Sequence, residues 1–216
     1  MKSIIALIIL LLSCSTMTSC NIAAVAAYIV SPDPEQLALY KLSDVRTVVF
    51  VDDRRNVMHP ARLKMVIADR ITNDLLVKKI VNTMISPRDI FRVSAANDRY
   101  NDPLSMGELG KAVDASVLIY VEMSAFGLTS DGKTANPRAS CTVRVLDCQN
   151  NKRLFPLEQA AHQVTASIKR VSPHQIESSG EIRSLTEELA EEIGDSVAKL
   201  FYDHNIGRLG ENLNRK

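Results

Sequence analysis

The spacing of apolar positions changes along the chain and predicts two prominent strands. The run RTVVFVDD at residues 46–53 is apolar without alternation and ends in acids. Such a run is typical of a strand that is buried on both faces and lies in the centre of a sheet. In SVLIYVEMSAF, at 116–126, every odd position from Val117 to Ala125 is apolar, while Glu122 falls on the other side. This alternation predicts a strand with one apolar face.

Three further segments have the composition of strands. They are residues 89–96, 138–148 and 162–170. The later strands are joined by a polar loop at 127–137 and by a turn at 150–151. Strands joined in this way are most simply antiparallel neighbours.

Apolar residues recur with a helical period over residues 61–84 and 178–204, so we predict a long amphipathic helix at each place. A shorter helix is predicted within residues 102–115. The shorter helix and the last helix each have a serine three residues before a glutamate, which is the spacing of a capping box. The two pairs are Ser105 with Glu108 and Ser178 with Glu181.

These elements follow the order β-α-β-α-β-β-β-α and predict an α+β fold. We expect a mixed, mainly antiparallel sheet of about five strands, with amphipathic helices packed on it. The chain of 216 residues is long enough for one domain with a sizeable core. We place this single domain at residues 42–204, and we predict that the polar residues 205–216 form a flexible tail.

The amino terminus has the pattern of an export signal. Lys2 is followed at residues 3–12 by the apolar run SIIALIILLL, which is too short to span a bilayer. The stretch MTSC that ends at Cys20 resembles the lipobox of bacterial lipoproteins. The resemblance implies that residues 1–19 are removed as a signal peptide and that a lipid, palmitate included, is attached to Cys20. Two or three acyl chains would make dissociation from a membrane negligible.

Three alternatives stay open for this segment. Cleavage before Cys14 would move the lipid there, but a bulky leucine, Leu12, then stands where a small residue is preferred. Residues 4–30 carry no charge and would be long enough for an uncleaved membrane helix, but the polar stretch SCSTMTSCN would then lie at bilayer depth. The third alternative is an ordinary cleaved signal with incidental cysteines.

Residues 20–41 are predicted to serve as the lipid anchor and a tether. The stretch SPDPEQ at 31–36 contains two prolines, which favour an extended chain. The lipobox resemblance implies a protein of the cell envelope that is anchored in a membrane and faces the periplasm. Asn21 stands where some inner-membrane lipoproteins have an aspartate, so the resemblance favours the outer membrane.

The segments ASVLIYVEMSAF and ASCTVRVLDCQNNKRLF, with the order of elements, resemble a domain of bacterial envelope lipoproteins. This group includes the curli-secretion lipoprotein, the amino-terminal domain of the periplasmic Tol-system protein, and lipoprotein activators of penicillin-binding proteins. Asp114 and Ala115 before an apolar strand, and Asp147 before a tight turn, occupy matching places within residues 44–204. The resemblance implies a non-enzymatic protein that binds other envelope proteins, and it is compatible with a homo-oligomer.

Charge and composition argue against several other classes of protein. The chain has 26 basic and 25 acidic residues, 5% aromatic residues and no tryptophan. It therefore lacks the positive field and the stacking surfaces that nucleic-acid binding requires. The sequence contains no Walker loop, no nucleophile elbow and no H-E-x-x-H motif. We assign no catalytic, cofactor-binding or metal-binding residue and predict that the protein is not an enzyme.

Two groups of polar residues are interpreted as ordinary surface. The four histidines lack the spacing of metal ligands. They are His59, His162, His174 and His204. The acids and arginines at 52–55 are interpreted as a solvated turn with ion pairs. A deep cleft lined by Asp52, Asp53 and His59 would instead favour an anchored enzyme.

Cys141 and Cys148 are predicted to be buried or half-buried thiols without a mutual disulfide. Seven residues along one strand span about 23 Å, and an odd offset points the two side chains to opposite faces. A disulfide needs Cα atoms within about 7 Å of each other.

The polar loop at 127–137 is the candidate surface for partner contact, because a loop of this length in a compact domain is often functional. Its candidate contact residues are Ser130, Asp131, Lys133 and Asn136. The sequence thus predicts a lipid-anchored protein that supports a membrane secretion, transport or cell-wall complex through protein contacts. The alternatives are a lipopolysaccharide-assembly-type lipoprotein and an anchored enzyme.

Overall fold

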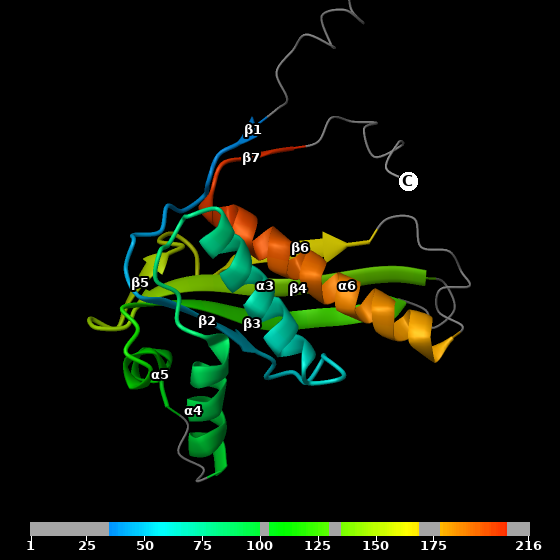
Figure 1. Cartoon of the computed structure of the whole chain (residues 1–216), viewed down its shortest axis with the longest axis horizontal. Helices are drawn as coiled ribbons and strands as arrows, with labels where there is room; N and C mark the ends of the chain where they lie inside the picture. Colours follow the sequence, from blue (N-terminus) through cyan, green and yellow to red (C-terminus); the bar gives the residue numbers. More distant parts are fainter. Residues whose placement is uncertain (1–34, 100–103, 130–134, 169–177, 207–216) are drawn as a thin grey trace, which may run out of the picture. The chain divides into compact units, whose positions relative to one another are not determined.

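The computed structural model describes residues 35–99, 104–129, 135–168 and 178–206 (Figure 1). The strands are β1 (Glu35–Gln36), β2 (Thr47–Asp52), β3 (Val117–Thr129), β4 (Ala135–Asp147), β5 (Lys152–Phe155), β6 (His162–Ser167) and β7 (His204–Asn205). The helices are α3 (Leu63–Val77), α4 (Pro87–Arg99), α5 (Met106–Ala112), α6 (Ser179–Ala198) and the short 3-10 helix η2 (Lys199–Phe201). Residues Leu37–His204 form one compact unit, and β1 pairs with β7 in a separate two-stranded sheet.

The main sheet has five strands and confirms the predicted α+β class. Its order is β2-β3-β4-β5, and β6 also pairs with β4, beyond the stretch that β5 covers. β2 and β3 are parallel, with Thr47 opposite Val117 and Asp52 opposite Glu122. The pairs of β4 with β3, β5 and β6 are all antiparallel, as the short connections predict.

One face of the sheet is covered by α3 and α6, which lie side by side across it (Figure 1). Buried residues from alternate strand positions, such as Val49 and Ile119, pack against helix residues such as Ile67 and Ile193. At Gly194 of α6 an added Cβ would meet the Arg70 side chain of α3 at 3.0 Å, so the two helices approach closely there. This layer forms the larger part of the core.

On the other face, α4 and α5 lie against β2 and β3 (Figure 1) and enclose a second apolar cluster. Val48, Phe50, Leu118 and Tyr120 point to this side and form a smaller buried cluster with Leu109. β2 is therefore buried on both faces, as its continuous apolar run predicts.

The prediction that β2 is central in the sheet is wrong, because β2 ends the strand order. Its outer edge is covered in part by the chain before α4. Thr47 forms an isolated bridge with Met84, its amide donates to the Thr83 carbonyl, and its carbonyl accepts from the Ile85 amide. An edge strand covered in this way needs no polar face, so its sequence resembles that of a central strand.

One other predicted element is wrong in type, and one observed strand was not predicted. Residues 89–96 lie in helix α4, which begins at Pro87 and has Asp89 in its first turn. The fifth strand of the sheet is instead β5, which has no counterpart among the predicted strands. The observed element order therefore differs from the predicted one, while the fold class and the number of strands in the main sheet agree.

The predicted helix at 61–84 is too long, because α3 ends at Val77. Lys79 has a positive φ of 55°. The amide of Lys79 donates to the Leu76 carbonyl and the amide of Ile80 donates to the Leu75 carbonyl. This pair of bonds is a Schellman motif, which ends a helix by satisfying its last carbonyls. Lys79 occupies the position where glycine is usual in this motif, so the end of α3 is hard to predict from the sequence.

The apolar face predicted for β3 ends before Ala125, which is exposed. The register with β4 shifts between Met123 and Ala125, and this β-bulge moves the alternation by one residue. In the part of the chain that the structure describes, no helix is long and apolar enough to cross a membrane.

Candidate functional site

The predicted site residues lie mostly outside the described residues. Cys14, Cys20 and the proposed tether up to residue 34 fall there, as do three of the four candidate contact residues. These three are Ser130, Asp131 and Lys133. Asn136 lies in strand β4, where its Oδ1 accepts a hydrogen bond of 3.2 Å from Arg138 Nε. The loop is therefore shorter than the predicted 127–137, because β3 extends to Thr129 and β4 begins at Ala135.

An apolar surface lies at the short strand β5, and we call it the β5 patch. Its residues are Leu39, Tyr40, Phe155, Leu157 and His162, which line a common hollow of about 340 Å³. The Tyr40 and Phe155 rings have centroids 5.5 Å apart, and the Phe155 and His162 rings have centroids 5.6 Å apart. Leu39 is 48% exposed and Leu157 is 73% exposed.

Hydrogen bonds on two sides hold the β5 patch in place. The amides of Leu39 and Tyr40 both donate to the Leu200 carbonyl, at 2.9 and 3.1 Å. On the other side, Arg153 donates from Nη1 to the Ala160 carbonyl at 3.1 Å and fixes the connection between β5 and β6. The patch thus joins residues from the start of the compact unit to residues more than one hundred positions later.

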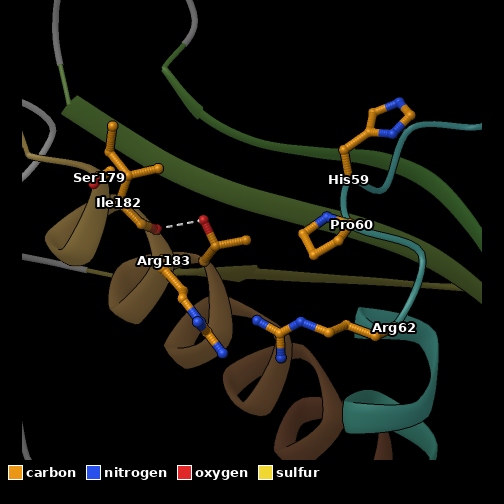
Figure 2. A pocket seen from close by; sticks show the side chains of 7 residues that line it. His59, Pro60, Arg62, Ser179, Ile182 and Arg183 are labelled. Carbon is orange, nitrogen blue, oxygen red and sulfur yellow. Dashed lines mark hydrogen bonds between the residues drawn. The ribbon is translucent and has the colours of Figure 1, made fainter.

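A second hollow of about 390 Å³ lies between the start of α3 and the first turns of α6 (Figure 2). We call it the arginine pocket. Its lining residues are His59, Pro60, Arg62, Ser179, Ile182, Arg183 and Thr186. Arg62 Nη2 and Arg183 Nε both contact Glu187 Oε1, the latter at 3.5 Å. The hydrogen bond from Arg62 lowers the pKa of Glu187 from its ordinary value, so this carboxylate is charged at neutral pH.

A hydrogen-bonded cluster lies at the carboxyl end of β2. The Tyr120 hydroxyl donates to Asp52 Oδ2 at 2.7 Å, and Arg54 Nε donates to the same oxygen at 2.9 Å. Burial, and then the bond to Asp52, raise the pKa of Tyr120, so the phenol stays neutral and acts as a donor. Arg144 lies 4.8 Å from the centroid of the Tyr120 ring and donates to Glu122 at 2.6 Å. These contacts pair the charges with one another.

The cleft that would favour an enzyme does not form among the described residues. Asp52 and Arg54 line a hollow of about 400 Å³ with apolar residues of α5. Asp53 uses both carboxylate oxygens to accept the Val57 and Met58 amides, each at 2.9 Å. His59 lines the arginine pocket instead. The three residues Asp52, Asp53 and His59 therefore do not share a cavity.

Both described cysteines are free and buried, and they lie in different core layers, as predicted. Burial raises the pKa of Cys141 to about 12 and that of Cys148 to about 11. Thiols with such pKa values are poor nucleophiles at neutral pH. Within the described ranges, no three histidine, cysteine or acidic side chains are grouped as metal ligands would be. His174 lies outside those ranges.

No protein-family model and no curated protein sequence matches this chain. Several solved structures have a distantly similar fold. A point variant of the PelC dodecamer from Paraburkholderia phytofirmans is 13% identical, with a TM-score of 0.44 over 79% of this chain and 96% of that chain. Lipoprotein GNA1162 from Neisseria meningitidis is 11% identical, with a TM-score of 0.38 over 72% and 100% of the two chains. The LpoB C-terminal domain from Salmonella enterica is 13% identical, with a TM-score of 0.37 over 59% and 84%.

Sequence reasoning missed both the β5 patch and the arginine pocket. The stretch LFPLE at 154–158 contains the signal for the patch, since three large apolar residues there flank a proline outside any predicted strand. The arginine pocket has no local signal, because Arg62 and Arg183 are 121 positions apart and meet only through the packing of α3 on α6.

Proposed function

We propose that this chain is a non-enzymatic, lipid-anchored protein of the bacterial cell envelope that supports a larger membrane or cell-wall complex by binding a partner protein. Residues 1–19 act as the signal peptide, Cys20 carries the lipid, and the domain faces the periplasm. Asn21 favours the outer membrane. The partner binds the β5 patch, and the exposure of this patch is the observation that carries the proposal.

The sequence of the amino terminus supports the anchor. The apolar run at 3–12 is long enough for an export signal and too short for a membrane span, and the small residues Thr18 and Ser19 precede Cys20. A lipid on Cys20 would leave 16 residues before Leu37, the first residue of the compact unit. At about 3.3 Å per extended residue, this tether would let the domain reach roughly 50 Å from the membrane surface.

The composition of the β5 patch supports a protein partner. Tyrosine and phenylalanine are enriched at the centre of protein interfaces, and here the Tyr40 and Phe155 rings pack beside two exposed leucines. The rim of the same hollow contains the polar residues Glu158 and Gln159. An apolar centre with a polar rim excludes water from a contact without making the free surface insoluble.

The hydrogen bonds made by three acidic side chains support a role without catalysis. Asp53 holds a turn, Glu108 completes a capping box, and Asp147 accepts the amides of Gln149 and Asn150. The described thiols are buried and protonated at neutral pH. These three acids and the two thiols are thus used to hold the fold or are buried in it.

Site-specific photo-crosslinking in cells tests the proposed contact. A photoreactive residue replaces Leu157 in the full chain, and the matched control replaces Val77, which is similarly exposed at 78% and lies at the end of α3. We expect an adduct with one envelope protein at position 157, at least several-fold stronger than at position 77, because apolar contact area concentrates at the patch. Leu39→Lys in the same chain should remove this adduct, since it places a charge beside Tyr40. Equal adducts at the two positions, or an adduct at 157 that persists in Leu39→Lys, would contradict the proposal.

A further inference from the structure

The arginine pocket brings two cationic side chains from different helices to one hollow. Arg62 precedes the first turn of α3, and Arg183 lies in the second turn of α6. Figure 2 shows the two guanidinium groups extending toward each other across the space between the helices. The side chains of Arg62 and Arg183 are 44% and 72% exposed, so solvent and solutes reach both.

The arginine pocket has more positive than negative side chains around it. Both arginines contact the same oxygen of Glu187, so in the described part of the chain two positive groups share one carboxylate. Each contact uses a single guanidinium nitrogen, while a guanidinium has five N–H donors. The pocket therefore keeps a net positive charge and several donors that Glu187 does not use.

The remaining lining residues define what could fill the space. Ser179 lines the far end of the pocket, away from the two guanidinium groups in Figure 2. Thr186 directs its hydroxyl to the Ile182 carbonyl. Pro60 and the partly exposed Ile182 supply an apolar side. The His59 ring points away from the two guanidinium groups in Figure 2, so it is not part of the donor set.

These features favour an oxyanion whose oxygens are arranged tetrahedrally. The planar fork of a guanidinium matches carboxylate and phosphate groups. Two guanidinium groups from two different helices suit the tetrahedral oxygens of a phosphate better than the two oxygens of a carboxylate, which lie in one plane. The apolar side of the pocket adds room for an organic group on that phosphate.

We propose that the arginine pocket binds the phosphate group of a phosphate ester, with Arg62 and Arg183 as donors. The phosphate belongs either to a soluble ester or to the headgroup of an anionic phospholipid. The two sources share the same chemistry at the pocket. This site is distinct from the β5 patch, since the two have no lining residue in common.

Isothermal titration calorimetry on the full chain in a non-ionic detergent tests the site. The probes are inorganic phosphate and dihexanoyl phosphatidylglycerol, each titrated at constant ionic strength set with potassium chloride. We expect saturable binding that Arg183→Ala weakens on the order of ten-fold, as for the loss of a charged hydrogen bond. Arg62→Ala should have a similar effect, and Glu187→Gln should strengthen binding because it removes the competing carboxylate.

The matched control is Arg92→Ala, which removes an arginine that is 77% exposed on α4, and it should leave binding unchanged. Arg183 is largely exposed, so its variant tests the site even where Arg62→Ala fails to fold. Tighter binding of the lipid than of inorganic phosphate assigns the site to a headgroup, and the reverse assigns it to a soluble ester. Absence of saturable binding to both probes, or binding that Arg183→Ala leaves intact, overturns the proposal.

Discussion

At the scale of single residues, the smaller core layer depends on a close contact between Cys148 and α5. Cys148 is fully buried, and its thiol lies against the backbone of Gly110. A Cβ built on Gly110 would lie 2.2 Å from Cys148 Sγ and 3.0 Å from Cys148 Cβ. Only a glycine therefore allows α5 to pack this closely on the end of β4.

Gly110→Ala is predicted to lower the free energy of unfolding by about 1–3 kcal/mol, because the added methyl group overpacks this contact. Urea denaturation measures the change. The control is Gly180→Ala, since a Cβ at Gly180 in α6 would meet no atom within 4 Å. That variant should be neutral or more stable by up to about 1 kcal/mol. Equal stabilities of Gly110→Ala and wild type would show that the contact is looser than described.

The alternation of side chains along a strand predicts the layer in which some residues lie, but it does not predict contacts between distant segments. The two described cysteines lie in separate layers because the alternation of a strand depends only on the offset between them. The β5 side of the β5 patch has a local signal in LFPLE, but the presence of Leu39 and Tyr40 in the patch has none, because the bonds of their segment to Leu200 bring them there. Contacts of this kind depend on the whole fold and leave no local pattern.

At the scale of elements, the errors occur where a helix signal and a strand signal overlap. Residues 89–96 contain Ile90, Phe91 and Val93, which suggested a strand, yet a proline at the first helical position and an acid in the first turn favour a helix. Helix starts with a serine cap were easier to predict. The Ser105 box is complete, since Ser105 accepts from the Glu108 amide at 3.3 Å and Glu108 accepts from the Ser105 amide at 2.8 Å.

Ser105→Ala is predicted to reduce the free energy of unfolding by about 1 kcal/mol, because the Glu108 amide at the start of α5 loses its acceptor. Ser105→Asp keeps an acceptor at this position and should retain most of the stability. Thermal and urea unfolding of wild type, Ser105→Ala and Ser105→Asp measure the three free energies of unfolding. If the alanine and aspartate variants lost the same free energy of unfolding, the side-chain cap at Ser105 would not contribute to stability.

At the scale of the whole molecule, the sequence predicted the class of the fold better than its connections. The sheet is mixed because β2 pairs in parallel with β3, although the three helices α3, α4 and α5 intervene between them. The antiparallel pairs of β4 follow from short connections, whereas the parallel pair follows from packing that no short segment specifies. The proposed function requires that the domain is attached to a membrane, and the proposed lipid on Cys20 would provide this attachment.

Radiolabelled palmitate incorporation, with membrane fractionation of the same cells, tests the anchor most directly. The samples are the full chain, Cys20→Ser and Cys14→Ser. Lipidation at Cys20 predicts that wild type and Cys14→Ser are labelled and sediment with membranes, while Cys20→Ser loses the label and leaves the membrane fraction. Label that survives in Cys20→Ser and disappears in Cys14→Ser would move the anchor to Cys14. Absence of label in all three proteins would contradict the lipoprotein account altogether.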